Sequence, residues 1–192
     1  MSGETGHEAA AVAERVERRW AILSVVAVVF MAGLAGFAGI HQATMPQARL
    51  ETANPATLHL SGEFVESNLG SAVEPDGSVT VRMIGQQYSF TPQCVLVPTD
   101  TPITLRATSA DAVHGFLVEG TNINTMLVPG YISQITARFS TPADHAMPCH
   151  EFCGLGHQSM WARVKVIAKT EFMAQMEKSG SAQKRRLDCV EQ

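Results

Sequence analysis

The amino-acid sequence predicts an all-β sandwich domain that follows a single transmembrane α-helix. The helix is predicted because residues 21–40 carry no charge, and a segment of that length is enough to cross the hydrocarbon core of a bilayer. The sandwich is predicted because apolar and polar residues alternate in short runs, separated by turn residues, after residue 66. The expected segments are a cytoplasmic N-terminal segment over 1–20, a transmembrane helix over 21–41, a linker over 42–66, the sandwich domain over 67–169, and a short helix with a disordered tail over 170–192.

The charges that flank the apolar segment predict its orientation. Three arginines precede it, whereas the nearest cation after it is Arg49. By the positive-inside rule the N-terminus is cytoplasmic and the domain after Gln42 is extracytoplasmic. A cleaved signal peptide is the alternative, but the apolar region of such a peptide is usually only about 7–15 residues long. An uncleaved anchor with Trp20 at the membrane interface is therefore favoured.

Period-two alternation predicts the strands of the domain. Val79, Val81 and Met83 alternate with polar residues, and the same pattern returns over 103–105, 135–139 and 164–166. These short runs favour an antiparallel sandwich. Residues 170–178 predict a short amphipathic helix whose apolar side carries Phe172, Met173 and Met176.

The net charge bears on the class of partner, and the positions of Cys94 and Cys189 bear on the roles of these two cysteines. A net charge of −4 with no evident basic face argues against nucleic acid as a partner. Cys94 lies in a strand-like run and is expected to be a small buried residue rather than a ligand. Cys189 lies in a polar tail, where a free thiol, a lipid attachment and a disulfide all remain open.

One short segment concentrates metal-binding side chains. Residues 149–160 contain two cysteines, two histidines and a methionine, and another histidine, His114, lies upstream. Thiolates, imidazole and thioether form a soft ligand set that selects copper over harder divalent ions. Two cysteines four residues apart can bridge two ions, with one histidine for each ion. The spacing therefore permits a dinuclear centre.

Three simpler interpretations of this segment compete with the dinuclear centre. A Cys149–Cys153 disulfide would suit an extracytoplasmic domain but leaves the histidines and Met160 without a role. A structural zinc site is disfavoured because methionine is a poor zinc ligand. A mononuclear blue-copper site needs two histidines, one cysteine and a weak methionine, and leaves the second cysteine unexplained.

The motif C-x-E-x-C-G-x-x-H-x-x-M over 149–160 resembles the CuA signature of subunit II of the heme–copper cytochrome c oxidases. The segment from His114 to Asn124 resembles the part of that family that carries the first histidine ligand. The similarity runs from about Trp20 to Val166. A single anchor looks most like the B-type bacterial and archaeal oxidases. The resemblance implies a cupredoxin-like Greek-key β-sandwich on the periplasmic side of a prokaryotic plasma membrane.

The resemblance also implies a ligand set. Cys149 and Cys153 would bridge both coppers, and His114 and His157 would each bind one. Met160 would be an axial ligand on one side, and the backbone oxygen of Glu151 on the other. In this family the carboxylate of the glutamate at position 151 can help to hold a Mg ion at the boundary with subunit I.

The implied function is electron transfer within a terminal oxidase, an oxidoreductase and translocase in which this chain only carries electrons. It would take electrons from a soluble cytochrome c or a small blue-copper protein and pass them to heme in subunit I, where O2 is reduced to water. Membrane lipid would surround the anchor. Tyr88 is the best candidate for the electron-entry side, and Trp161 could pack over the site or lie on the docking face.

Glu17 resembles a glutamate at the cytoplasmic end of the anchor in B-type oxidases, where a proton channel of subunit I opens. A solvated charge on the helix is the simpler interpretation. Two other functions remain open for the chain. It could be the CuA subunit of a nitric oxide reductase-type enzyme, or a membrane-tethered copper carrier.

Overall fold

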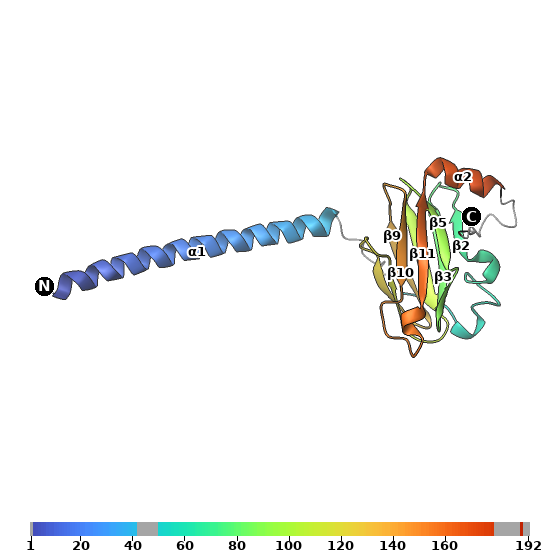
Figure 1. The fold of residues 1–192 in the computed structure, drawn as a ribbon, viewed down its shortest axis with the longest axis horizontal. Coiled ribbons are helices and arrows are strands. Elements are labelled where there is room, and N and C mark those ends of the chain that lie inside the picture. Colours follow the sequence, from blue (N-terminus) through green and yellow to red (C-terminus); the bar gives the residue numbers. More distant parts are fainter. Residues whose placement is uncertain (1, 42–49, 179–188, 190–192) are drawn as a thin grey trace. The chain divides into compact units, whose positions relative to one another are not determined.

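The computed structural model describes residues 2–41, 50–178 and 189 and divides into two compact units, Met1–Ala43 and Thr44–Gln192. The first unit contains the helix α1 (Ser2–His41) (Figure 1). Its part Ala11–His41 is long and apolar enough to cross a membrane, and every side chain there is exposed. The helix begins well before the predicted start at residue 21. Alanine, glutamate and arginine, which are strong helix formers, are frequent in this earlier stretch.

The second unit is the predicted sandwich, and its described residues form three sheets. The largest has the strand order β1-β9-β6-β3-β2, with β4 paired to β3; a second has the order β10-β11-β5, and β7 pairs with β8. The strands of the largest sheet are β1 (Glu51–Thr52), β2 (Gly70–Val73), β3 (Val79–Gln86), β4 (Ser89–Thr91), β6 (Ile103–Ser109) and β9 (Tyr131–Ala137). The others are β5 (Cys94–Pro98), β7 (His114–Leu117), β8 (Asn124–Leu127), β10 (Ala143–Pro148) and β11 (Trp161–Ile167).

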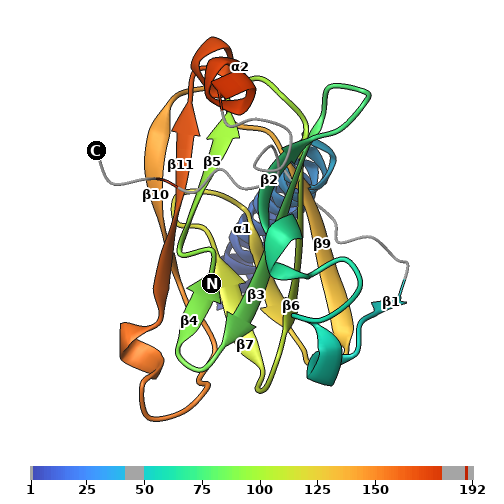
Figure 2. The same cartoon turned by 90° about the vertical axis from the view of Figure 1, so that its right-hand side faces the viewer.

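The prediction of a purely antiparallel sandwich is wrong for two strand pairs. β3 runs parallel to β6, and β11 runs parallel to β5. The chain leaves β3, forms β5 in the other layer, and returns as β6 beside β3 in the same direction. Because β5 belongs to the other sheet, β3 and β6 become neighbours without a hairpin between them and can run in the same direction. Figure 2 shows the two layers, with α2 (Lys169–Lys178) at one end and the 149–160 loop at the opposite end.

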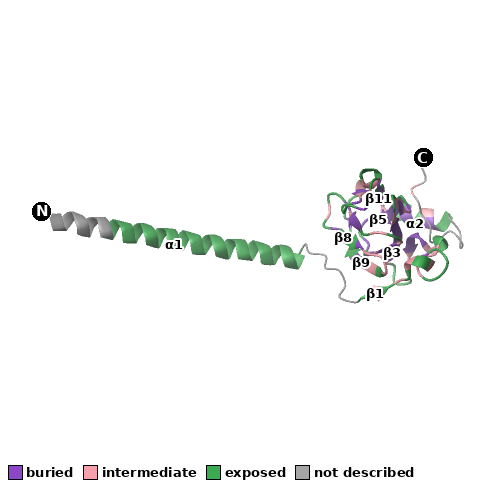
Figure 3. Cartoon of the chain, turned by 90° about the horizontal axis from the view of Figure 1, so that it is seen from below, coloured by how far each residue is buried: buried purple, intermediate pink, exposed green. Residues whose placement is uncertain are grey.

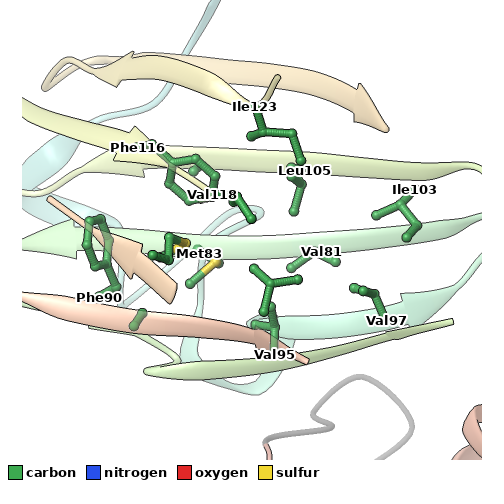
Figure 4. Close-up of a cluster of buried hydrophobic side chains, with 14 of the residues drawn as sticks. Val81, Met83, Phe90, Val95, Val97, Ile103, Leu105, Phe116, Val118 and Ile123 are labelled. Atoms are coloured by element: carbon green, nitrogen blue, oxygen red, sulfur yellow. The ribbon is translucent and has the colours of Figure 1, made fainter. Parts of the chain in front are cut away.

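Both layers contribute to one apolar core. Val79, Val81 and Met83 are at most 1% exposed, as their alternation predicts. Figure 4 shows this cluster, in which β3 and β6 supply side chains that pack beside Phe90 and Phe116. The two phenylalanine rings meet edge to face, with centroids 6.1 Å apart. Because β7 carries Phe116 directly after His114 and Gly115, this packing fixes the backbone of the strand that presents His114.

Residues 50–69 cover the outer face of the largest sheet. The predicted linker over 42–66 is therefore too long, since Leu58 and Phe64 are buried and pack with Leu69 and Ile84. The apolar residues of the 50–69 segment follow no fixed period, so a search for periodic patterns does not predict this packing. As a result, β3 is buried on both faces, and the exposed surface of the domain lies mainly on its loops and edges (Figure 3). The rest of the predicted linker, residues 42–49, lies outside the described residues.

The C-terminal segment is joined to the sandwich at two points. α2 buries Phe172 and Met176, while Met173 is 39% exposed, contrary to its predicted place on the apolar side. Cys94 and Cys189 form a disulfide with their Cα atoms 5.3 Å apart. Cys94, predicted to be a small buried residue, is half-buried and forms this disulfide. The tail predicted to be disordered lies outside the described residues except at Cys189.

An ion-pair cluster attaches the 50–69 segment to the sheet, and we expect its loss to destabilise the domain. Glu63 pairs with Arg82 at 3.0 Å and with Arg106 at 2.5 Å, and the side chains of these arginines are only 17% and 14% exposed. Glu63→Ala leaves both guanidinium groups without this carboxylate, which should cost about 2 kcal/mol of unfolding free energy. Urea denaturation of the full chain measures the change.

Glu66→Ala, on the same segment but exposed, is the control and should change stability by less than about 0.5 kcal/mol. Equal effects of the two substitutions would contradict the role of the cluster.

Candidate metal centre

The 149–160 loop leaves the sheet at the end of β10 and returns to it at the start of β11. The amide of Cys149 donates to the carbonyl of Met160 at 2.9 Å, so the base of the loop is closed by a backbone hydrogen bond. A short 3-10 turn, His157–Ser159, follows the two cysteines. The loop therefore brings both of its ends, and the side chains near them, to one point at the end of the sandwich.

The strand β7 lies directly against this loop. Phe116 pairs with Cys149, and the amide of His150 donates to the carbonyl of Gly115 at 3.2 Å. A Cβ atom on Gly115 would stand 2.5 Å from backbone atoms of His150 and Glu151. Only glycine therefore allows β7 to approach closely enough to place His114 beside the cysteines.

The donor atoms of the predicted ligands face one another in two sets. Cys149 Sγ lies 3.8 Å from His114 Nδ1 and 3.3 Å from the carbonyl oxygen of Glu151. Cys153 Sγ lies 3.6 Å from His157 Nδ1 and 3.8 Å from Met160 Sδ. The two sulfur atoms are 3.8 Å apart, and both cysteines are free thiols. Each thiol is thus accompanied by one imidazole and one weak donor.

This arrangement fits a copper centre better than the simpler alternatives. His114, Cys149 and Cys153 are buried, and their ligand atoms lie within 4.8 Å of one another. The two sulfur atoms stand in the middle of a row of contacts, with His114 Nδ1 beside Cys149 Sγ at one end and His157 Nδ1 beside Cys153 Sγ at the other. Soft sulfur donors paired with imidazole match the preference of copper. Met160 is fully buried with its sulfur facing Cys153, as a weak axial ligand would be.

Asp111 orients His114, a contact that the sequence pattern did not predict. The Nε2 atom of His114 lies 2.9 Å from Asp111 Oδ1, which leaves Nδ1 facing the cysteine sulfur. Although partial burial acts to raise the pKa of Asp111, hydrogen bonds from Gln87, His114 and Ala112 hold that pKa below its ordinary value. A carboxylate that accepts from the outer nitrogen of a ligating histidine fixes its tautomer and raises its basicity. The signal in the sequence that could have predicted this contact is an aspartate three residues before a ligand histidine.

The predicted electron-entry residues lie beside the loop and are partly exposed. Tyr88, between β3 and β4, is 38% exposed, and Trp161 is 50% exposed with its indole N–H donating to the carbonyl of Gln158. Phe90 is buried in the core. Two apolar residues at unspecified positions of the motif, Phe152 and Leu155, are 73% and 92% exposed. Glu17 is exposed on α1, in the other unit.

The protonation of Cys153 leads to a testable pH dependence. Burial, and then the adjacent Cys149, raise the pKa of the Cys153 thiol to about 11. In the metal-free chain we expect its alkylation rate to rise about tenfold per pH unit from neutral pH and to keep rising above pH 9, because only the thiolate reacts. Mass spectrometry of the alkylated peptide measures the rate. In urea the rate should level off near the ordinary thiol pKa of 9.0. The same early plateau in the folded chain would contradict the shift.

Comparisons with known proteins agree on the nature of this domain. A family model described as "Cytochrome C oxidase subunit II, periplasmic domain" matches residues 79–167. A cytochrome c oxidase subunit 2 of Thermus thermophilus is 32% identical over 152 residues, which cover 78% of this chain and 90% of that protein. The subunit 2 of Saccharomyces cerevisiae is 29% identical over 113 residues, which cover 59% of this chain and 43% of that protein.

A solved structure is similar in fold. One chain of a heme-copper terminal oxidase dimer, determined by cryo-EM, superposes with a TM-score of 0.59 at 20% identity, covering 79% of this chain and 99% of that chain. The 149–160 loop, His114 and Asp111 all lie within the region that the family model matches.

Proposed function

Because this chain belongs to the cytochrome c oxidase subunit II family, we propose that it is the electron-entry subunit of a membrane terminal oxidase. In this role it takes electrons from a soluble donor at a dinuclear CuA centre and passes them to heme in subunit I, which reduces O2 to water. The observation that carries the proposal is the pairing of each buried thiol with one imidazole around a shared pair of sulfur atoms.

Each residue of the proposed ligand set would bind copper in a different way. Cys149 and Cys153 would bridge the two copper ions, and His114 and His157 would each bind one through Nδ1. Met160 and the carbonyl oxygen of Glu151 would supply the weak donors. A copper pair held by these residues would supply a carrier of one electron. The protein contributes a rigid, largely buried surrounding, which limits the rearrangement that accompanies electron transfer.

Electron paramagnetic resonance of the full-length chain, purified in detergent and loaded with copper, tests the proposal. We expect a hyperfine pattern from one electron shared by two copper nuclei, with two copper ions bound per chain. A pattern from a single nucleus, or binding of one Cu(I) ion, would overturn the dinuclear centre and favour a blue-copper or carrier function. If the two-copper pattern is found, oxygen consumption by the assembled complex distinguishes an oxidase from a nitric oxide reductase.

Electrons would enter over the exposed surface around the loop. Tyr88 and Trp161 lie next to it, and Phe152 and Leu155 extend it with apolar side chains. Such a surface suits a cytochrome c or a small blue-copper protein that binds transiently. Trp161→Leu should slow electron uptake from the donor in stopped-flow measurements and leave the copper spectrum unchanged. Trp20→Leu makes the same change on α1 and is the control.

The disulfide supports an extracytoplasmic position for the copper domain. Disulfides persist in oxidising compartments and are rare in the cytosol. With α1 as a membrane anchor in contact with lipid, the N-terminus would then be cytoplasmic and the domain periplasmic, in a prokaryotic plasma membrane. Cys94 and Cys189 should be found oxidised when membranes are isolated with free thiols blocked. A fully reduced pair would argue for the opposite orientation.

Two further roles are part of the same proposal. The side chain of Glu151 is exposed and could supply one carboxylate to a Mg ion, whose other ligands would come from subunit I. Glu17 on α1 would lie at the cytoplasmic side, near a proton entrance of subunit I. Glu17→Gln in the assembled oxidase should slow turnover without changing the copper spectrum. Unchanged turnover would remove that role.

A further inference from the structure

The turn between β3 and β4 lies against the 149–160 loop. A Cβ atom on Gly154 would stand 2.6 Å from the hydroxyl oxygen of Tyr88, and one on Gly156 would stand 2.5 Å from its ring. The two glycines therefore let the loop backbone lie directly on the Tyr88 side chain. This contact brings the neighbouring residue, Gln87, to the same part of the loop.

Gln87 makes two hydrogen bonds to different halves of the candidate centre. Its backbone amide donates to Asp111 Oδ2 at 2.7 Å. Its side-chain amide donates to the carbonyl oxygen of Cys153. Since Asp111 also contacts His114 Nε2 at 2.9 Å, Gln87 connects the segment that carries His114 to the backbone of Cys153.

These contacts complete a closed circuit around the donor atoms. On the inner side, His114 Nδ1 faces Cys149 Sγ, which faces Cys153 Sγ, each at 3.8 Å. On the outer side, hydrogen bonds run from the Cys153 carbonyl through Gln87 and Asp111 to His114 Nε2. Three segments that are distant in the sequence, at residues 87, 111–114 and 149–153, are held together by this circuit.

We infer that Gln87 is a positioning residue of the metal centre. Its two hydrogen bonds fix the separation between the His114 half and the Cys153 half, so that the sulfur and nitrogen donors keep their spacing whether or not metal is bound. The inference rests on the proposed copper function for its spectroscopic consequences, but the same contacts exist in the metal-free chain. Neither of these two hydrogen bonds is made to a sulfur or imidazole atom of the centre.

The test compares Gln87→Leu with Gln86→Leu in the full-length chain. Leucine removes the side-chain amide that donates to the Cys153 carbonyl with little change in size, and it keeps the backbone amide that donates to Asp111. Gln86, the preceding residue, has no side-chain hydrogen bond among those described for the domain. Because Gln87 is exposed and Gln86 is half-buried at the end of β3, neither variant should lose its fold. We expect Gln87→Leu to release copper to a chelator about tenfold faster, as loss of outer-shell partners does. Its hyperfine pattern should also become unequal between the two nuclei, and its reduction potential should shift.

Gln86→Leu should behave as the wild-type chain does. Equal copper release and identical spectra for Gln87→Leu and wild type would overturn the inference, as would an equal change in both variants. A wild-type chain that shows no two-copper spectrum would instead overturn the proposed function.

If the wild-type chain shows no two-copper spectrum, the positioning role of Gln87 can still be tested on the metal-free chain. Cys149 and Cys153 are its free thiols, and Gln87→Leu should increase their alkylation rate under native conditions by about fivefold, the equivalent of one lost hydrogen bond of about 1 kcal/mol. An unchanged rate would count against the positioning role.

Discussion

Cys153→Ser should abolish the two-copper spectrum and electron transfer by this chain while leaving its domain folded. Cys153 Sγ stands between Cys149 Sγ, His157 Nδ1 and Met160 Sδ, so its removal leaves the His157 side of the donor set without a sulfur that could join it to the other side. A serine hydroxyl is a harder and much less acidic donor than a thiol, and copper binds it poorly. The loss in copper affinity should exceed the roughly 10–100-fold that removal of an outer-shell partner costs.

A cysteine-to-serine change away from the centre provides the matched control. Cys94→Ser combined with Cys189→Ser removes the disulfide and leaves the loop intact. This double variant should unfold at a lower temperature but keep the two-copper spectrum. Copper analysis, electron paramagnetic resonance and thermal unfolding on the same samples separate the two effects. A two-copper spectrum that survives in Cys153→Ser would mean that the cysteines do not bridge the ions.

The strands and the ligand loop were predictable because their information is local. Alternation over 79–83 places three side chains in the core, and all three are buried. The spacing of two cysteines, a histidine and a methionine along one loop likewise predicts which side chains can converge. In the structure the sulfur atoms of Cys149 and Cys153 lie within 4.8 Å of a ligand atom of His114, and His157 and Met160 contact Cys153 Sγ.

The parts that the sequence did not reveal depend on contacts between distant segments. Leu58 and Phe64 follow no regular period, so their packing over the outer face of the sheet emerges only once β3 and β6 are side by side. The Cys94–Cys189 disulfide joins residues 95 positions apart, and the sequence around either cysteine does not identify the other as its partner. The contacts of Gln87 and Asp111 are similar, because each is an ordinary polar residue until the fold brings it to the loop.

Gly115→Ala should disrupt the centre from outside the ligand set. The added Cβ would stand 2.5 Å from the carbonyl carbon of His150 and from the amide nitrogen of Glu151, both of which are backbone atoms. No side-chain rotation can relieve this overlap, so β7 and the loop must separate, and His114 must move away from Cys149. Overpacking of this kind costs about 1–3 kcal/mol, and here it should fall at the upper end. We expect lower stability and loss of the two-copper spectrum together.

Gly156→Ala provides the contrast that identifies the cause. Its Cβ would also stand 2.5 Å from a neighbour, but that neighbour is the Tyr88 ring, a side chain that can be truncated. Gly156→Ala should therefore be milder than Gly115→Ala, and Tyr88→Ala in the same chain should relieve its strain. No such second-site change exists for Gly115, since its contacts are backbone. Equal thermal midpoints and intact spectra for Gly115→Ala and wild type would mean that β7 does not need this close approach to hold His114 in place.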